Sequence, residues 1–344
     1  MEHRRIIAAA VECGTRISTA VLRRCAMLSL VLTILATASL ANDKPGIVCD
    51  GPGCVDYWII DTRCLPCCGD FSDLIDRIAI WHAEAGGWVR YSREGFLAAT
   101  DSDLPMSFYV HGIFSNSKAA WSQARELFGT VGAGLPPFRG VLWSWPSDFE
   151  CGMGIRDQVY RGIANTQAQA FYLATIIDSL GPRVPVSLVG HSLGGRAIVA
   201  TLHGLAAREI GGQSLPEPSY PQPRPIQAAL IAPAIDPFSL WPGRQYGRTL
   251  SQVDRLLVSY NPQDRVLRGY ERWFDRDALG LRGLPMPSNR DGDFQKVSQV
   301  NANPAVRKRH LPSAYFESPL VASWLRGFVS YQDEPEFVGS PPSP

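Results

Sequence analysis

One stretch near the middle of the chain limits the fold more than any other. Residues 186–189 are a mostly apolar run typical of a short buried strand, and from Ala197 on apolar residues recur at helical spacing. Between them, Gly190-His191-Ser192-Leu193-Gly194 fits the pattern G-x-S-x-G, in which a serine occupies a sharp strand-to-helix turn. We therefore predict that Ser192 is a nucleophile at the carboxyl edge of a sheet. The competing interpretation is a glycine-rich turn with an ordinary serine.

Strand-like and helical runs alternate on both sides of this stretch. Such alternation predicts an α/β fold with a mainly parallel sheet and helices on both faces. The proline-rich run 215–225 is predicted to be a loop. The expected strands are 55–61, 87–91, 106–110, 140–143, 228–232 and 255–260, and the expected helices include 71–82, a segment around 121–128, and 165–180.

The first 41 residues predict a targeting segment. Arg23 and Arg24 precede an apolar run over 26–36, and small residues suited to signal-peptidase cleavage follow it. Because the run is short for a membrane span, we expect a signal peptide, with an uncleaved membrane anchor as the alternative. The expected location is outside the cell or in the periplasm or cell envelope, with possible membrane proximity through this leader.

Cysteines are concentrated in the segment that follows the leader. This use of cysteine suits an oxidising compartment and predicts structural disulfides whose pairing stays open, with a redox or metal-binding role as the alternative. We therefore divide the chain into a cysteine-rich segment that leads into the first strand (42–70), an α/β domain (71–330) and a disordered tail (331–344). The six cysteines beyond the leader are Cys49, Cys54, Cys64, Cys67, Cys68 and Cys151.

Charge excludes one class of partner. The chain has 33 basic and 32 acidic residues, a formal net charge of +1. Binding to nucleic acid relies on an extended basic field, which this balance does not supply, so no nucleic-acid partner is expected. Apart from the short run Arg307-Lys308-Arg309, no polybasic block in the sequence indicates binding to an anionic membrane surface.

Four motifs occur in a fixed order: His111-Gly112, Ser144-Trp-Pro-Ser147, His191-Ser-Leu-Gly-Gly-Arg196, and His310 followed by Tyr315-Phe316. This ordered set resembles the α/β-hydrolase superfamily, and within it a group of serine hydrolases with the same four features. The resemblance spans about residues 105–320 and leaves the cysteine-rich segment uncovered. It implies an α/β-hydrolase fold and a Ser-His-Asp triad. The group often has Asn soon after the His-Gly pair, whereas this chain has Ile113-Phe114 there.

His310 is the predicted base. In this fold the chain order is serine, acid and then histidine, and only His203 and His310 follow Ser192. His203 lies 11 residues after Ser192, on the expected helix. That spacing places it roughly 16 Å along the helix axis, at 1.5 Å per residue. His310 remains by elimination, unless it is a solvated loop histidine.

Two residues compete for the acid that orients the base. Asp264 follows the expected strand 255–260, where the superfamily usually keeps this acid, and Asp236 follows the preceding expected strand. The resemblance carries an aspartate at both places. We favour Asp264 and interpret Asp236 as a structural residue of its loop, but the sequence leaves the choice open.

Two backbone amides are expected to form an oxyanion hole. Leu193, directly after the nucleophile, supplies one, and Ile113 is the first choice for the other, with Phe114 next. His111 and His191 are expected to support these groups by holding the backbone around them. An ordinary core histidine is the alternative for His111.

These expectations define a function. The chain is expected to be a serine hydrolase that cleaves a carboxylic ester or related acyl bond in a small molecule through an acyl-enzyme, with no cofactor and no metal. One alternative is a non-catalytic scaffold of the same fold that binds a partner at the cell envelope. The other is an acyltransferase that uses the same three residues.

Overall fold

The computed structural model describes residues 55–66, 69–100, 102–220, 224–288 and 292–331. The predicted leader (1–41), Cys49, Cys54, Cys67, Cys68 and residues 332–344 of the predicted tail lie outside these residues, so those predictions remain predictions. Within the described ranges, no helix is both long enough and apolar enough to cross a bilayer.

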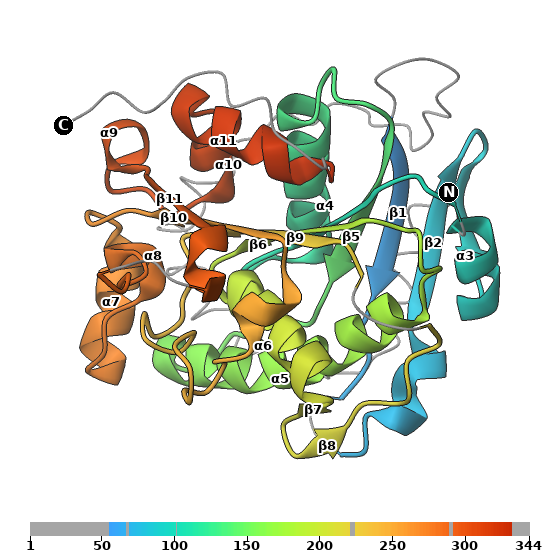
Figure 1. The fold of residues 1–344 in the computed structure, drawn as a ribbon, viewed down its shortest axis with the longest axis horizontal. Helices are drawn as coiled ribbons and strands as arrows, with labels where there is room; N and C mark the ends of the chain where they lie inside the picture. The colour runs from blue at the N-terminus through green and yellow to red at the C-terminus, as the bar shows by residue number, and fades with distance from the viewer. Residues whose placement is uncertain (1–54, 67–68, 101, 221–223, 289–291, 332–344) are drawn as a thin grey trace.

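A nine-stranded sheet forms the centre of the described residues (Figure 1). Its strand order is β11-β10-β9-β6-β4-β5-β1-β2-β3, parallel from β11 to β1, with β2 and β3 added antiparallel at one side. The strands are β1 (Val55–Asp61), β2 (Ala79–Glu84), β3 (Gly87–Tyr91), β4 (Met106–Val110), β5 (Phe138–Ser144), β6 (Val186–His191), β9 (Ile226–Ile231), β10 (Arg255–Tyr260) and β11 (Val297–Asn301).

Helices cover both faces of this sheet. Figure 1 shows α5 and α6 on one face and α4, α10 and α11 on the other. The α-helices are α3 (Arg93–Thr100), α4 (Ser117–Glu126), α5 (Ile155–Ser179), α6 (Leu193–Ala207), α7 (Arg265–Phe274), α8 (Leu279–Arg282), α9 (Asn303–Val306), α10 (Pro312–Phe316) and α11 (Pro319–Val329). Shorter elements are η1 (Ser72–Arg77), η2 (Leu127–Val131), η3 (Thr249–Gln252), η4 (Gly292–Lys296), and the two-stranded sheet of β7 (Glu209–Ile210) and β8 (Gln213–Ser214).

The middle strands are the most deeply buried part of the molecule. Every residue of β4, β6 and β9 is buried, as expected for parallel strands covered on both faces. β6 lies between β4 and β9, and Gly190 pairs with Val110 on one side and Leu230 on the other. The turn that follows β6 is therefore flanked by the loops that follow β4 and β9.

The predicted fold class is confirmed, and all six expected strands are present. The helix expected over 71–82 is wrong, because this segment forms η1 and then strand β2. Its apolar residues fit helical spacing, but a short apolar run is ambiguous, and pairing of β2 with both β1 and β3 decides its conformation. β1 lies within 42–70, the segment that was expected to lead into the first strand.

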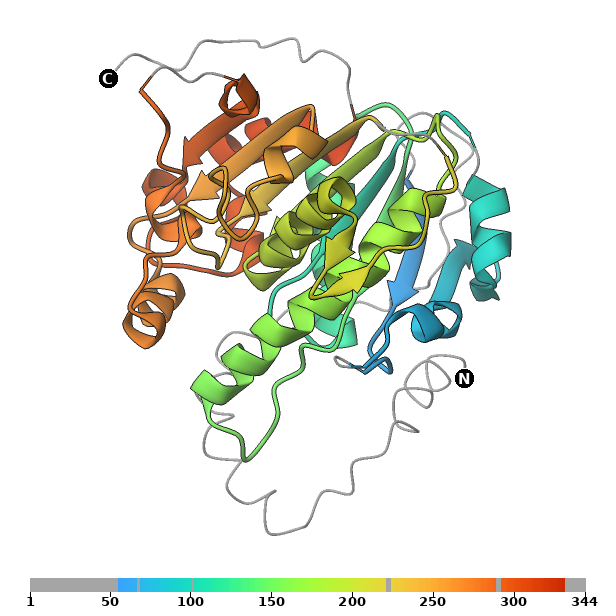
Figure 2. The same cartoon turned by 60° about the horizontal axis from the view of Figure 1, so that its bottom comes forward.

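Two further elements differ from the expectation. Helix α5 begins at Ile155, ten residues before the expected start, and Figure 2 shows its first turns extending beyond the sheet. Ile155, Val159 and Ile163 recur at helical spacing in these turns, a signal that our prediction of this helix did not use. Strand β11 was not predicted because it is a half-exposed edge strand with only two buried residues, Val297 and Val300.

Candidate active site

Ser192 occupies the sharp turn between β6 and α6. Its backbone has φ 54° and ψ −118°, a conformation that a residue other than glycine rarely adopts. The turn is held because the N–H of Ser192 donates to Ile231 O at 2.9 Å, which ties the elbow to the end of β9. This is the strained corner that the G-x-S-x-G pattern predicts.

Glycines beside Ser192 allow the tight packing of this turn. A Cβ atom on Gly194 would lie 2.0 Å from the carbonyl oxygen of Val110, and one on Gly190 would lie 2.8 Å from Gly195. A side chain on Gly194 would push the turn away from the end of β4, and one on Gly190 would push β6 away from α6. The two glycines therefore let β4, β6 and α6 pack closely around Ser192.

His310 contacts both Ser192 and Asp264. Its Nε2 lies 3.0 Å from Ser192 Oγ, and its Nδ1 lies 2.7 Å from Asp264 Oδ2. Because a carboxylate only accepts hydrogen bonds, Nδ1 carries the proton and Nε2 is free to accept one from the serine hydroxyl. Two hydrogen bonds thus join three side chains that are far apart in sequence, since Asp264 lies 72 residues after Ser192 and His310 lies 46 residues after Asp264.

Asp264 is fixed independently of His310. It is fully buried and forms the N-cap of α7, where its Oδ1 accepts from the N–H groups of Val266 and Leu267 at 2.9 and 3.0 Å. The hydroxyl of Tyr315 lies 3.4 Å from Oδ2. Burial raises the pKa of Tyr315, so this hydroxyl keeps its proton and can donate.

The two rejected candidates lie elsewhere. Asp236 accepts from the N–H of Phe238 at 2.8 Å, and its Oδ2 lies 3.5 Å from Arg276, so it caps its own loop. His203 accepts from the backbone N–H of Arg248 at 3.3 Å, on the part of α6 that points away from the elbow. Neither residue contacts His310 within the described part of the chain.

His191 supports the loop that carries His310. Its Nε2 donates to the backbone carbonyl oxygen of His310 at 2.7 Å. Burial, together with the nearby His310, lowers the pKa of His191 to about 3, so the ring stays neutral near neutral pH. This hydrogen bond fixes the backbone of His310, while Asp264 fixes its ring.

The two amides expected to bind an oxyanion have no protein acceptor within the described residues. Phe114 differs, because its N–H donates to Ser147 O at 2.6 Å. Because this N–H is already bonded, Phe114 cannot supply the second donor to the oxyanion, and Ile113 remains the candidate. The side chains of Ile113 and Leu193 both pack against Gly162 of α5. A Cβ atom on Gly162 would lie 2.7 Å from Ile113 Cδ1 and 2.9 Å from Leu193 Cδ1.

His111 holds the loops after β4 and β5 together. Its Nε2 lies 3.2 Å from the N–H of Trp145, and its Nδ1 lies 2.9 Å from Gly112 O and 3.3 Å from Ser147 Oγ. Burial, reinforced by the charge of Arg63, holds the pKa of His111 well below its usual range. A neutral His111 can then accept at Nε2 and donate at Nδ1.

Arg63 completes this cluster and was missed in the sequence. Its guanidinium group contacts His111 Nε2 at 3.2 Å and donates to Ser115 O at 2.9 Å, while Nε donates to Ser144 Oγ at 2.8 Å. It therefore links the loops after β1, β4 and β5. The available signal was its position, two residues after the buried strand β1, where parallel strands present their functional side chains.

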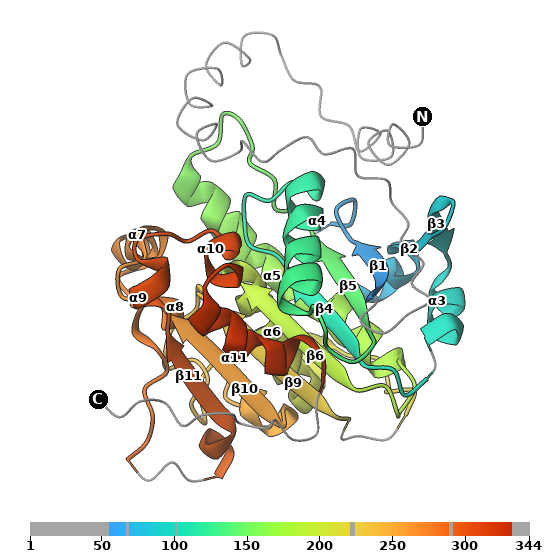
Figure 3. The same ribbon diagram turned by 90° about the horizontal axis from the view of Figure 1, so that it is seen from above.

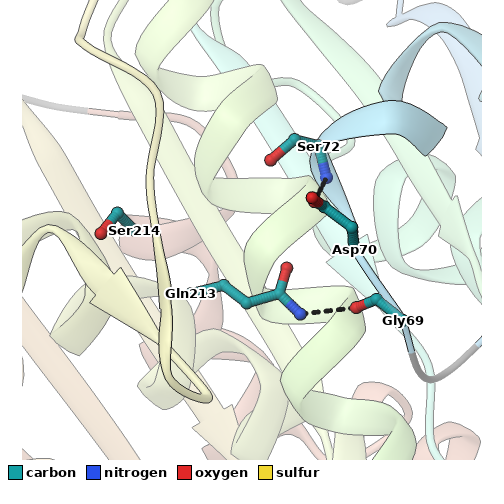
Figure 4. A pocket seen from close by; sticks show the side chains of 5 residues that line it. All are labelled: Gly69, Asp70, Ser72, Gln213 and Ser214. Atoms are coloured by element: carbon teal, nitrogen blue, oxygen red, sulfur yellow. Dashed lines mark hydrogen bonds between the residues drawn. The ribbon is translucent and has the colours of Figure 1, made fainter.

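No other candidate centre appears in the described residues. Among them, no group of three His, Cys, Asp or Glu side chains is placed to hold a metal ion. Figure 4 shows a surface pocket in which Gln213 donates to Gly69 O at 2.6 Å and the N–H of Ser72 donates to Asp70 Oδ1 at 2.9 Å. None of the residues that line this pocket belongs to the group around Ser192, His310 and His111.

Comparisons with known proteins agree with this architecture. Residues 108–338 match the model of the alpha/beta hydrolase family. Because the match covers more than half of the chain, the chain belongs to this family. No curated protein matches the chain.

Several solved structures are similar to the chain. An inhibited esterase B from Lactobacillus rhamnosis is 13% identical over 90% of this chain and 94% of its own, with a TM-score of 0.40. Acyl-protein thioesterase 2 from Zea mays is 16% identical over 67% and 95%, with a TM-score of 0.36. Carboxyl esterase 2 from Tuber melanosporum is 13% identical over 87% and 94%, with a TM-score of 0.37.

Proposed function

We propose that the chain is a serine hydrolase that cleaves a carboxylic ester or a related acyl bond of a small molecule. The observation that carries this proposal is the position of His310, which is hydrogen-bonded to Ser192 Oγ through one ring nitrogen and to buried Asp264 through the other. A serine needs a base to take its proton and a third group to hold that base. The three side chains have the geometry for these roles.

In the first half of the reaction, Ser192 Oγ attacks the acyl carbonyl carbon and its proton passes to His310 Nε2. The carbonyl oxygen becomes an oxyanion that accepts hydrogen bonds from the amides of Leu193 and Ile113. Asp264 stabilises the imidazolium that forms. The bond to the leaving oxygen then breaks, that oxygen takes the proton from His310, and an acyl-enzyme remains on Ser192.

In the second half, water replaces the alcohol. His310 Nε2 takes a proton from water, the hydroxide attacks the acyl carbon, and a second oxyanion forms in the same place. Collapse of this intermediate releases the carboxylic acid and returns the proton to Ser192. These steps use groups of the chain itself.

Hydrolysis of a graded set of p-nitrophenyl esters tests this proposal. We expect turnover by the wild-type chain and, for Ser192→Ala, a fall in kcat of about 10⁴-fold or more. Ser323→Ala is the matched control, because Ser323 is exposed on α11 and its hydroxyl donates only to Leu320 O within the described residues. Its activity should equal that of the wild type.

Two results would contradict the proposal. Turnover that survives in Ser192→Ala would place the chemistry elsewhere. A folded wild-type chain that cleaves none of the esters and none of the matching thioesters would instead favour the non-catalytic scaffold.

A further inference from the structure

Exposed apolar side chains gather on the loops around Ser192. Of the ten large apolar side chains that are exposed in the described residues, six lie between 4 and 11 residues after the last residue of a parallel strand, in the loops and first helical turns at the carboxyl edge of the sheet. We call these six the apolar rim: Phe114, Phe149, Ile155, Phe238, Val266 and Leu311.

The rim surrounds the predicted reaction centre. Phe114 follows Ile113, Val266 lies two residues after Asp264, and Leu311 directly follows His310. Phe114 and Phe149 come from different loops, yet their rings are 5.7 Å apart. The rim is therefore a feature of one edge of the molecule and not a set of scattered positions.

Positive charge is concentrated on the same edge. Residues 265–276 and 303–317 together contain seven basic and three acidic side chains, whereas the whole chain has a net charge of only +1. The two segments adjoin, because the N–H of Arg265 donates to Lys308 O at 3.5 Å, and Figure 3 shows α7, α9 and α10 on one side of the molecule.

Three cations in the segments that carry Asp264 and His310 lack acidic partners. Arg265, Arg307 and Lys308 are exposed, and none of them forms an ion pair with any residue that the structure describes. Two acidic side chains of this edge are already paired, Asp236 with Arg276 at 3.5 Å and Glu271 with Arg282 at 3.1 Å. The part of the edge formed by the start of α7 and residues 307–311 therefore presents uncompensated positive charge beside the exposed side chains of Val266 and Leu311.

We propose that this edge docks on an anionic lipid bilayer, with the carboxyl ends of the parallel strands facing the lipid. Lys and Arg near an anionic leaflet are attracted to its surface, while apolar side chains beside them enter the boundary between headgroups and acyl chains. Arg265 and Val266 are adjacent in sequence, and Arg309 and Leu311 flank His310, so both kinds of contact come from the same short segments. The proposal rests on surface residues and does not depend on catalysis.

A bilayer suits this surface better than a protein partner does. A protein interface needs matched shapes around a closely packed apolar centre. The rim residues project from several separate loops, with charged residues between them. A fluid bilayer can accommodate such a surface without a matching shape.

Co-sedimentation of the full-length chain with vesicles tests the docking. We expect stronger binding to phosphatidylcholine vesicles that contain phosphatidylglycerol than to phosphatidylcholine alone. Arg265→Gln/Lys308→Gln should weaken binding to the anionic vesicles about thirtyfold at low salt, at about 1 kcal/mol per charge. Val266→Ser/Leu311→Ser should weaken it about tenfold.

Matched controls come from other parts of the surface. Val89→Ser changes an exposed valine of β3, and Arg183→Gln removes a cation at the opposite edge of the sheet, where Arg183 pairs with Asp103. Both should bind within about twofold of the wild type. If the rim variants bind as tightly as these controls, or if the wild type binds neither kind of vesicle, the proposal is wrong.

A second measurement separates the rim from any binding by the N-terminal segment. Hydrogen–deuterium exchange read by mass spectrometry compares the rim with β3 in the same chain. With phosphatidylglycerol vesicles present, peptides that contain residues 265–267 and 309–313 should exchange more slowly, and peptides that contain residues 87–91 should not change. An equal change in the two sets of peptides would overturn the proposal, whatever the total binding.

Discussion

At the scale of single residues, the predicted site depends on how His310 is held. Asp264 Oδ2 accepts from its ring at 2.7 Å, and His191 donates to its backbone carbonyl at 2.7 Å. One bond sets the tautomer and the other sets the position of the loop. The strained turn after β6 places Ser192 Oγ 3.0 Å from Nε2 of this ring.

Asp264 has two separable roles, which a pair of substitutions distinguishes. In Asp264→Asn, the side-chain oxygen can still cap α7, but the amide no longer favours the required tautomer of His310. We expect kcat to fall about 10⁴-fold while the melting temperature stays close to wild type. Asp264→Ala should lose similar activity and also about 1 kcal/mol of stability, measured by urea unfolding.

Asp236→Asn is the control for this pair. Asp236 caps its own loop and lies apart from His310, so the variant should retain wild-type kcat. A large loss of kcat in Asp236→Asn, together with a small one in Asp264→Asn, would reverse the assignment of the acid.

At the scale of elements, the packing of α6 beneath the elbow is the critical feature. In Gly194→Ala the new Cβ atom would lie 2.0 Å from Val110 O, which is backbone and cannot rotate away. We expect a loss of about 3 kcal/mol of unfolding free energy and of most of the activity. Urea unfolding and ester hydrolysis measure the two effects.

Gly327→Ala supplies the helical control. No atom lies within 4 Å of the position of its Cβ in α11. Alanine favours a helix more than glycine does, so this variant should gain about 1 kcal/mol. Equal behaviour of Gly194→Ala and Gly327→Ala would show that the elbow tolerates a side chain.

Elements could be predicted from the sequence where periodicity and burial agree. The β6–α6 unit has a buried strand followed by a long apolar helix, so both were predicted. The segment 71–82 and strand β11 were not predicted correctly. Pairing with neighbouring strands decides their conformation, and the spacing of their own apolar residues does not reveal that pairing.

The candidate site likewise has residues that the sequence could predict and contacts that it could not. Chain order and motif spacing selected Ser192 and His310 and favoured Asp264, but they left Asp236 open as the acid. The hydrogen bonds of His310 in the structure join it to Ser192 and Asp264. The contacts of Arg63 were not predictable, because they join loops that are 48 and 81 residues away in sequence and depend on how the sheet is assembled. The hydrogen bond from His191 to the backbone of His310 depends on the same long-range contact.

At the scale of the whole molecule, buried neutral histidines should make the fold sensitive to acid. The pKa of His191 is about 3 in the folded chain, against about 6.5 for an unfolded histidine. Below pH 6.5 the unfolded chain therefore binds a proton that the folded chain does not, and stability falls as the pH decreases toward 3. The expected slope is about 1.4 kcal/mol per pH unit for this residue, and His111 adds to it in the same direction.

Urea midpoints at neutral pH and at about pH 5 measure this dependence. His191→Gln removes one buried histidine, so its stability should decrease less with acid than that of the wild type. Identical pH dependence in the two chains would contradict the assignment of His191 as a buried neutral ring.

His82 acts in the opposite direction. Burial alone would lower its pKa, but the hydrogen bonds and charges of Asp56 and Glu84 together outweigh burial and raise it. The stability that His82 contributes is therefore present in acid and is lost as the pH rises through its raised pKa. Asp56→Asn should reduce this contribution, which the same urea midpoints at low pH would detect.

Covalent labelling with a fluorophosphonate probe tests the central claim most directly, because the probe reacts only with an activated serine. We predict that the folded wild-type chain is labelled at Ser192, as located by mass spectrometry of the modified peptide, and that both Ser192→Ala and His310→Ala lose the label. Absence of labelling in the folded wild-type chain, or labelling at another serine, would contradict the account.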